Sequence, residues 1–376
     1  MTKYQQLFET LQHQILQGKF ANNRRLPSES ELALRYQISR PTAARALKEL
    51  QALGIITRRA GSGSYLQTPS RPPAEPRKMI LGLLVPGLGK TEILDPICNE
   101  ITRFAQSREC TVLWGDAAEP IATGADALSL CEQYIQRGVD GVFFAPMETG
   151  PDCALWNRRV ADALLSARIP LVLLDRDLCE FPARSNFDLI GIDNFRAAII
   201  VTQHLLNAGS RRLCFLARPE YPSTTDLRLA GCRQAVLLAS NGATISAAFV
   251  NPEDRMAIEN LLRQHEPDAV LCANDQTAAL LLRTLNELGV RTPSSIRIAG
   301  FDDVQYATLL AVPLTTIHQP CREIARAATL ALMERTIDQS IPAREILLPF
   351  ELIIRKSSGM VSRSETANDT SSQAIP

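Results

Sequence analysis

The feature that most constrains the fold is a regular alternation of short apolar runs with amphipathic segments. The apolar runs cover residues 79–85, 111–114, 141–145, 171–175, 188–192, 211–216, 269–273, 296–300 and 314–317. Segments with helical periodicity lie between them, at 94–107, 126–137, 153–167, 194–208 and 226–239. Buried parallel strands separated by helices are typical of a doubly wound α/β fold. There are more strands than one sheet usually holds, so the pattern predicts two Rossmann-like lobes.

A proline-rich segment separates this region from the start of the chain. From Thr68 to Lys78 the sequence reads TPSRPPAEPRK, which has four prolines and predicts a stiff, extended linker. The predicted domains are a head at 1–68, a linker at 69–78, a two-lobed body at 79–358 and a disordered tail at 359–376. We assign about 79–187 and 320–343 to the first lobe, and about 188–318 and 344–358 to the second.

Charge is distributed unevenly between the head and the body. The whole chain has 40 Lys and Arg against 40 Asp and Glu, but residues 1–70 have ten against four. The head is therefore basic and the rest of the chain acidic, which indicates that the head is the part that meets a polyanion.

The nine cysteines are spread along the chain without a CxxC pair. This pattern favours free thiols in a reducing cytoplasm over a disulfide framework or a zinc site. The N-terminus has no apolar core of a signal peptide, and no apolar run approaches 18 residues. We therefore expect a cytoplasmic protein that is neither exported nor membrane-spanning and that binds no metal.

The head has the pattern of three helices followed by a hairpin. Leu7, Leu11, Ile15 and Leu16 lie on one face of a first helix. Ser28 with Glu31 forms a capping box for a second helix, and Ser39 can cap a third. Two short strands surround a Gly-Ser-Gly turn at 61–63. This arrangement predicts a winged helix-turn-helix whose third helix enters the major groove of DNA.

Over residues 3–67 the head resembles the GntR family of bacterial transcriptional regulators. The matching residues are Leu26-Pro27-Ser28-Glu29, Leu32-Ala33, Ser39-Arg40-Pro41-Thr42, Ala46-Leu47, Leu50, Gly54-Ile55-Ile56 and Gly61-Ser62-Gly63. The resemblance implies that Arg40 and Thr42 contact bases or phosphates and that Gly61 reaches the minor groove.

Residue chemistry supports this interpretation of the head. The planar guanidinium of Arg40 suits a guanine edge or a phosphate. Arg45 and Lys48 are placed for the DNA backbone, or are solvated charges on a helix surface. Arg58 and Arg59 beside a glycine turn suit a narrow groove. The predicted DNA-binding residues are Ser28, Ser39, Arg40, Pro41, Thr42, Arg45, Lys48, Arg58, Arg59 and Gly61.

From Met79 to Gly359 the chain resembles the effector-binding core of LacI/GalR-type repressors, which are relatives of periplasmic sugar-binding proteins. The matching motifs are 80–86 (ILGLLVP), 174–176 (LDR), 192–194 (IDN), 227–231 (LRLAG), 273–275 (AND), 300–303 (GFDD), 314–317 (LTTI) and 348–355 (LPFELIIR). The resemblance implies two lobes joined by crossover strands, an effector in the cleft between them, and dimerisation through the body.

The predicted effector-binding residues follow strands and carry the groups that a polyol requires. Arg228 offers donors to hydroxyls or a carboxylate. Asn274 caps the helix 275–287 or contacts the ligand, and Asp302 is a bidentate acceptor or a turn residue. Asp175 and Arg176 either face the ligand or pair with each other, and Gln319 either contacts the ligand or braces the hinge. His318 is expected to be structural.

The loop after the first strand, VPGLGKTEI, resembles a phosphate-binding loop only in part. Gly89-Lys90-Thr91 matches its end, but the position of the first glycine is Leu84. Nucleotide hydrolysis is therefore not expected. The loop carries Lys90 and Glu92, and we include Lys90 among the effector-binding residues. Its charges indicate a carboxylated, phosphorylated or amino sugar, or side chains that point to water.

These patterns predict a DNA-binding transcriptional regulator, a repressor controlled by a small sugar-like effector, with no enzymatic activity and no cofactor. Its expected partners are double-stranded DNA with a palindromic operator, the effector and a second copy of the chain. Two alternatives remain. The body could be enzyme-like, as in GntR proteins fused to aminotransferase-like domains, or could sense something other than a sugar. A transport binding protein is disfavoured by the basic head.

Overall fold

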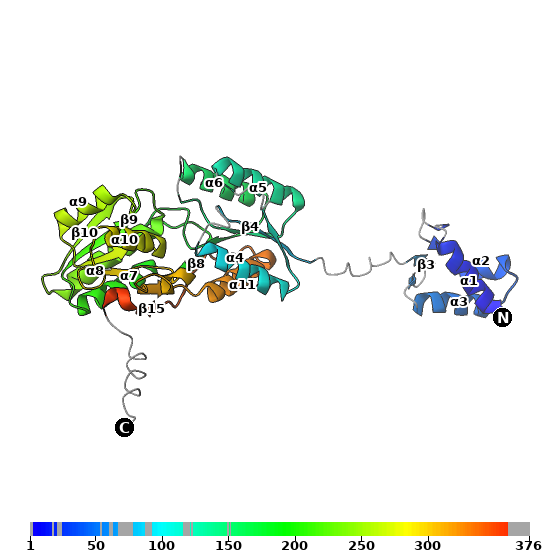
Figure 1. Ribbon diagram of the computed structural model, residues 1–376. Helices are drawn as coiled ribbons and strands as arrows, with labels where there is room; N and C mark the ends of the chain where they lie inside the picture. The colour runs from blue at the N-terminus through cyan, green and yellow to red at the C-terminus, as the bar shows by residue number, and fades with distance from the viewer. Residues whose placement is uncertain are drawn as a thin grey trace, which may run out of the picture. The chain divides into compact units, whose positions relative to one another are not determined.

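The structure of the chain is a computed structural model that describes residues 3–16, 19–20, 25–52, 55–59, 63–66, 78–86, 92–115, 121, 123–148, 150 and 152–359. The chain divides into two compact units, Met1–Arg77 and Lys78–Pro376 (Figure 1). Each unit is described by itself below.

The first unit contains three helices and a small antiparallel sheet. The helices are α1 (Lys3–Leu16), α2 (Glu29–Arg35) and α3 (Arg40–Ala52), and the strands β1 (Arg25–Leu26), β2 (Ile56–Arg59) and β3 (Gly63–Leu66) pair in the order β1-β3-β2. Its core consists of the buried side chains of Leu7, Leu11, Leu26, Leu32, Ala43, Ala46, Leu47, Leu50 and Ile56. The predicted apolar faces of the first and third helices thus pack against each other, and the fold is a winged helix-turn-helix.

The first lobe of the second unit is built on a six-stranded parallel sheet of order β14-β8-β7-β6-β4-β5. The strands are β4 (Ile80–Leu84), β5 (Thr111–Trp114), β6 (Gly141–Phe144), β7 (Leu171–Leu174), β8 (Asp188–Ile192) and β14 (Glu345–Leu348). Helices α5 (Gly124–Arg137) and α6 (Cys153–Ser166) cover one face, and α4 (Leu94–Gln106) and α11 (Cys321–Ile337) the other (Figure 1). Because both faces are covered, the central strands β4, β6 and β7 are apolar throughout.

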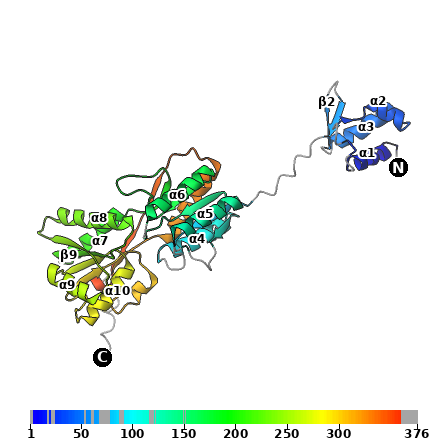
Figure 2. The ribbon, with the colours of Figure 1, turned by 90° about the horizontal axis from the view of Figure 1, so that it is seen from above.

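The second lobe has a four-stranded parallel sheet of order β10-β9-β11-β12. The strands are β9 (Arg212–Ala217), β10 (Thr244–Phe249), β11 (Ala269–Cys272) and β12 (Arg297–Ala299). Helices α7 (Asn194–Asn207) and α8 (Ser223–Ala239) pack on one face, and α9 (Arg255–His265) and α10 (Asp275–Glu287) on the other (Figure 2). A Cβ at Gly231 would lie 2.2 Å from the Phe195 carbonyl oxygen, so a glycine here allows α8 to approach α7 closely.

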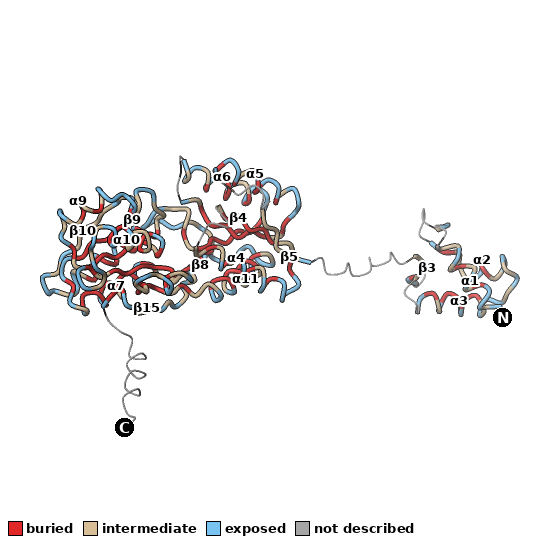
Figure 3. Tube along the Cα trace, in the orientation of Figure 1, coloured by how far each residue is buried: buried red, intermediate tan, exposed pale blue. Residues whose placement is uncertain are grey.

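The chain passes between the lobes three times. It leaves the first lobe after β8, returns after β13 (Thr316–His318) and crosses again between β14 and β15 (Glu351–Ile353). β13 and β15 pair antiparallel as a two-stranded ribbon. The remaining elements are the 3₁₀ helices η1 (Gln305–Thr308) and η2 (Lys356–Ser358). Figure 3 shows that buried residues follow the strands of both lobes.

The lobe boundaries differ from the predicted ones in two places. Residues 188–192 and 344–348 were assigned to the second lobe, but β8 pairs with β7 and β14 pairs with β8 in the sheet of the first lobe. A buried ion pair network holds these strands in the first lobe. The Asp188 carboxylate receives two hydrogen bonds from Arg335 on α11, at 2.7 and 2.8 Å. It receives three from Arg344: from the backbone N–H at 2.7 Å, from Nη2 at 2.9 Å and from Nε at 3.4 Å.

Candidate functional site

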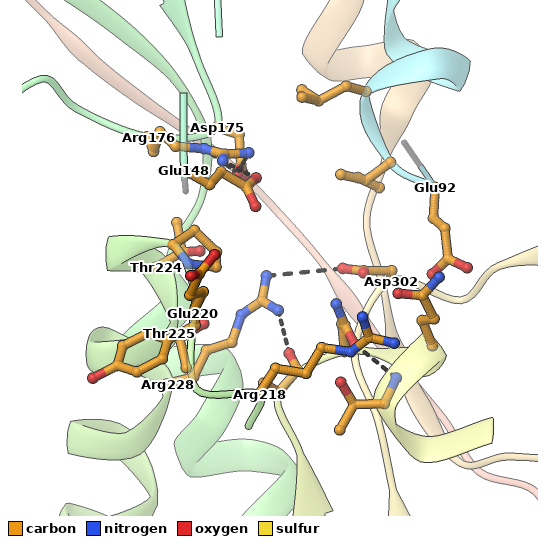
Figure 4. Close-up of a pocket in the computed structure, with 18 residues that line it drawn as sticks. Glu92, Glu148, Asp175, Arg176, Arg218, Glu220, Thr224, Thr225, Arg228 and Asp302 are labelled. Carbon is orange, nitrogen blue, oxygen red and sulfur yellow. Dashed lines mark hydrogen bonds and ion pairs between the residues drawn. The ribbon is translucent and has the colours of Figure 1, made fainter. Parts of the chain in front are cut away.

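A cavity of about 280 Å³ lies in the cleft between the two lobes (Figure 4). It opens at the carboxyl ends of strands from both sheets, which is where doubly wound folds bind ligands. The charged residues that line it are Glu92, Glu148, Asp175, Arg176, Arg218, Glu220, Arg228 and Asp302. A lining so rich in charged donors and acceptors suits a hydrophilic ligand with several hydrogen-bonding groups.

Arg228, in the second turn of α8, is held by three contacts. Its Nε donates to Asn194 Oδ1 at 2.8 Å, its Nη1 donates to the Ala273 carbonyl at 2.5 Å, and its guanidinium lies over the Phe301 ring, 4.4 Å from the centroid. Its Nη2 points toward Asp302 and lies 3.8 Å from Oδ1 (Figure 4). This distance is too long for a hydrogen bond, so Nη2 is an oriented donor that can serve a ligand.

Asp302 follows β12 and places its buried carboxylate opposite Arg228. Gln319 Nε2 donates to Asp302 Oδ1 at 2.7 Å, which leaves Oδ2 as an acceptor. Burial raises the pKa of Asp302 to about 6, although Arg228 and the bond from Gln319 act in the other direction. Arg228 and Asp302 together offer one donor and one acceptor, which is the combination that neighbouring hydroxyls require.

Asn274 caps a helix and also lies in the wall of the cavity. Its Oδ1 accepts from the Thr277 backbone N–H at 2.9 Å and so caps α10. Its side chain also lines the cavity, and its Nδ2 has no protein partner among the described residues. The cap fixes the side chain and leaves an amide donor for a ligand.

Asp175 and Arg176 pair with each other at the end of β7. Arg176 Nη2 lies 2.9 Å from Asp175 Oδ2, and Nη1 pairs with Glu148 from the loop after β6. Both residues also line the cavity, so mutual pairing does not remove them from the site. Burial raises the pKa of Asp175, and burial followed by the charge of Arg228 lowers the pKa of Arg176 to about 9.

Five of the seven predicted effector-binding residues line this one cavity: Asp175, Arg176, Arg228, Asn274 and Asp302. Gln319 is buried behind Asp302 and supports it, which corresponds to bracing rather than ligand contact. Lys90 lies outside the described residues.

The sequence analysis did not select several residues that line the cavity, namely Glu92, Glu148, Arg218, Glu220, Thr224 and Thr225. Most of them lie in loops that follow a predicted strand, and position alone could have indicated them. The hydroxyl of Tyr306 in the second lobe donates to Glu92 Oε1 in the first, so this pair bridges the lobes. Burial raises the pKa of Glu92, while Tyr306 and Arg218 oppose that shift.

The residue after Asp302 ties the site to the crossover strands. Asp303 Oδ1 accepts from Arg355 Nη2 at 2.6 Å, and Asp303 Oδ2 lies 2.9 Å from His318 Nδ1. His318 is therefore a structural residue, as expected. Thr316 Oγ1 donates to the buried Asp275 at 2.6 Å and so links β13 to the start of α10.

In the first unit, α3 carries an exposed basic surface. Arg40 and Pro41 are exposed at its N-terminus, and Arg45 and Lys48 are exposed further along. The Arg45 guanidinium lies over the Tyr4 ring, 4.1 Å from the centroid, so it is partly occupied within the unit. Donors and positive charge at a helix N-terminus suit a phosphate.

The predicted serines act as caps. Ser28 and Glu31 form the capping box of α2, and the Ser39 and Thr42 hydroxyls are hydrogen-bonded at 2.7 Å. Arg58 and Arg59 lie on β2, but their side chains are outside the described part of the chain, as is Gly61.

Within the described ranges, no group of His, Cys, Asp and Glu could hold a metal ion. No helix there is long and apolar enough to cross a membrane.

Two protein families match the chain. Residues 3–66 match the gntR family of bacterial regulatory proteins, and residues 202–358 match the periplasmic binding protein-like domain. The first match covers the winged helix-turn-helix, and the second covers most of the second lobe together with α11 and the last strands.

The individual proteins to which the chain is similar are transcriptional regulators. The arabinose metabolism transcriptional repressor of Geobacillus stearothermophilus is 27% identical over 371 residues, which is 95% of this chain and 98% of that protein. The HTH-type transcriptional repressor PurR of Photobacterium profundum is 30% identical over 229 residues, 59% of this chain and 65% of that protein. The crystal structure of the transcription regulator GntR from Chromobacterium violaceum is 26% identical with a TM-score of 0.59, covering 75% of this chain and all of that one.

Proposed function

We propose that this chain, which matches the gntR family at residues 3–66 and the periplasmic binding protein-like domain at residues 202–358, is a transcriptional repressor controlled by a small sugar-like effector. In this proposal residues 1–68 bind operator DNA and residues 79–358 bind the effector. The names of its relatives, which are transcriptional repressors, support a regulator over an enzyme.

The observation that carries the proposal is the pairing of Arg228 with Asp302 across the cavity. One guanidinium nitrogen and one carboxylate oxygen are held in place by protein contacts, and both remain available to a ligand. Asn274 adds an amide donor from a third strand end. The relative named for arabinose metabolism supports a sugar as the effector.

Control of DNA binding follows from the path of the chain between the lobes. Asp302 lines the cavity, and the neighbouring Asp303 is bonded to His318 on β13 and to Arg355, which follows β15. Closure of the cleft on a ligand would therefore shift the crossover strands. Effector and operator binding are then reciprocally coupled, by typically ~1–3 kcal/mol. We propose that two copies of the chain carry two heads onto a palindromic operator in the cytoplasm.

The proposal is tested by replacing Arg228 with Ala and titrating the operator complex with a panel of sugars in a gel-shift assay. Arg228→Ala leaves ligand acceptors without a buried donor, a change that typically costs ~1–3 kcal/mol or more. We expect the variant to bind operator normally and to lose the effector response. The matched control is Arg233→Ala, which removes an exposed arginine from the same helix and should respond like the unmodified chain.

A thermal melt of each variant shows whether the body remains folded. A normal response of folded Arg228→Ala to the effector would show that the cavity is not the effector site.

A further inference from the structure

We propose that the effector pocket continues into a second subsite that takes an uncharged sugar ring, so that the effector is a neutral disaccharide. The inference rests on the proposed function and specifies the ligand class of the same cleft. It depends on a second cavity beside the first, on the way its walls are held, and on the charges that line it.

The second cavity, of about 470 Å³, adjoins the first along the N-terminal turns of α8. The two cavities share Glu148, Arg176, Tyr221 and Pro222 as lining residues. A molecule bound at Arg228 and Asp302 can therefore extend past Arg176 without leaving the cleft. One sugar ring uses the hydrogen-bonding groups of the first cavity, and the second cavity leaves room for a second sugar ring.

Buried hydrogen bonds fix the walls of the second cavity in the first lobe. Asn157, buried on α6, binds the Met147 backbone twice: its Oδ1 accepts from the N–H at 2.8 Å and its Nδ2 donates to the carbonyl at 3.0 Å. Asp177 Oδ1 accepts from the backbone N–H groups of Cys179 and Ser185, at 2.9 and 3.1 Å. The loops after β6 and β7 are thus held in place by protein contacts, and a site formed between them needs little ordering when a ligand binds.

The charges of the second cavity determine the class of ligand. The lining contains the carboxylates of Glu148, Asp177, Glu180 and Asp226 and a single arginine, Arg176. Arg176 pairs with Glu148, and Asp177 pairs with Arg184 at 3.4 Å, so Glu180 and Asp226 leave the lining negatively charged. A phosphate or carboxylate on the ligand would meet like charge here. Hydroxyl groups instead find acceptors, so an uncharged polyol fits this lining better than an anionic sugar.

Apolar groups of the same lining suit the C–H faces of a sugar ring. Tyr221 is stacked on Phe249 with the ring centroids 5.0 Å apart, so its position beside both cavities is supported. Phe181 lies at the rim of the second cavity with 76% of its surface exposed. Met147 and Leu227 complete this part of the lining. Exposed apolar side chains that surround a cavity commonly mark a ligand-binding groove.

The test is isothermal titration of the full-length chain with neutral monosaccharides and the corresponding disaccharides: xylose and xylobiose, glucose and cellobiose, galactose and lactose, arabinose and arabinobiose. Glucose 6-phosphate provides the anionic probe. We expect one disaccharide to bind about tenfold more tightly than its monosaccharide, and the phosphate to bind more weakly than glucose.

Two tryptophan substitutions on α6 test whether the second sugar ring lies in the second cavity. Ala154 is exposed and lines the second cavity, so Ala154→Trp fills it, whereas Leu155 is exposed and lines neither cavity. The ratio of disaccharide to monosaccharide affinity should fall to near one in Ala154→Trp and stay about tenfold in Leu155→Trp.

The titrations distinguish failure of the second subsite from failure of the proposed sugar-controlled repressor. Equal affinities for both sizes of sugar, an unchanged ratio in Ala154→Trp, or preference for the phosphate would overturn the second subsite while the sugar-controlled repressor stands. If no sugar of either size binds, the proposed function itself is wrong, and the second subsite with it.

Discussion

At the scale of single residues, the most unusual backbone lies at the centre of the site. Asp302 has a φ of +113° and Asp303 a φ of +55°, a region that residues other than glycine rarely adopt. Such conformations cost roughly 1–3 kcal/mol each and persist where surrounding contacts hold them. Here Gln319 holds the first carboxylate and Arg355 the second. The strained pair directs one carboxylate to the cavity and the next to the crossover strands.

The raised pKa of Asp302 also predicts how effector binding depends on pH. Burial raises its pKa to about 6, so the folded protein holds this proton more tightly than the unfolded chain, and the group's contribution to stability falls as pH rises from about 4 to about 6. Effector hydroxyls donate to the ionised carboxylate. Effector affinity should therefore rise between about pH 5 and 7 and level off above that.

Calorimetric titrations over this pH range measure the dependence. Asp302→Asn should bind more weakly and show no rise near pH 6. A rise of the same size in the variant would assign the dependence to a neighbour such as Asp175 or Glu92, whose pKa values burial also raises.

At the scale of helices and strands, one ion pair network holds together elements that are distant in sequence. Asp188 at the start of β8 binds Arg335 on α11 and Arg344 before β14, and is itself completely buried. These bonds outweigh the cost of burial and lower the pKa of Asp188 to about 2. Its contribution to stability is therefore present above about pH 4 and is lost as the pH falls through about 2.

Asp188→Ala leaves two guanidinium groups without their shared carboxylate. Breaking a buried pair in this way typically costs ~3–5 kcal/mol. We expect the free energy of unfolding of the body, measured by urea denaturation near neutral pH, to fall by about this amount. Glu334→Ala is the control, because it removes an exposed partner of Arg344 and should cost less than about 1 kcal/mol. Equal effects of the two substitutions would contradict a special role for the buried network.

The recognition helix α3 carries the prediction for DNA binding. The basic head displaces counterions from DNA, so operator affinity should fall steeply as salt rises. Arg40→Ala should weaken operator binding by ~1–3 kcal/mol and relax the preference at one base position. Lys19→Ala, which removes an exposed positive charge outside this helix, is the control. Fluorescence anisotropy with operator variants measures both effects, and unchanged specificity in Arg40→Ala would exclude it as a base contact.

How far the sequence predicts these elements depends on what their residues show locally. The runs at 111–114 and 188–192 are strands with the same bounds in the structure. The second is buried at every position, whereas the first lies at the edge of the sheet and is only partly buried. β10 was not predicted, because Thr244 and Ser246 interrupt the apolar residues of TISAAF. β8 belongs to the first lobe through its pairing with β7 and β14, and its Asp188 binds Arg335 and Arg344 from distant parts of the chain. No local pattern contains that information.

The candidate site shows the same limit. Residues such as Arg228 and Asn274 could be selected because motif and position at a strand end coincide. The partner of Arg176 could not, because Glu148 reaches it from another loop and carries no motif of its own. The bridge from Tyr306 to Glu92 joins residues 214 positions apart and appears only when both lobes are folded.

At the scale of the whole molecule, the proposed function requires two heads for one operator. A single winged helix makes few base contacts, and linking two heads through the body makes the second contact intramolecular. A closed dimer is two-fold symmetric and matches a palindromic operator. Multi-angle light scattering of the full-length chain at micromolar concentration should therefore give twice the 41.4 kDa of one chain. A monomer under these conditions would contradict the dimer.

The three passages between the lobes also determine the order in which the body is completed during synthesis on the ribosome. The first lobe lacks α11 and β14 until residues 321–348 have been made, although its other strands end at Ile192. Until then β8 has one uncovered edge, and Asp188 has neither of its arginines. The second lobe, whose sheet is complete by Ala299, can thus assemble before the first is finished. A chain that stops before residue 321 leaves an open sheet edge, which is a site for aggregation.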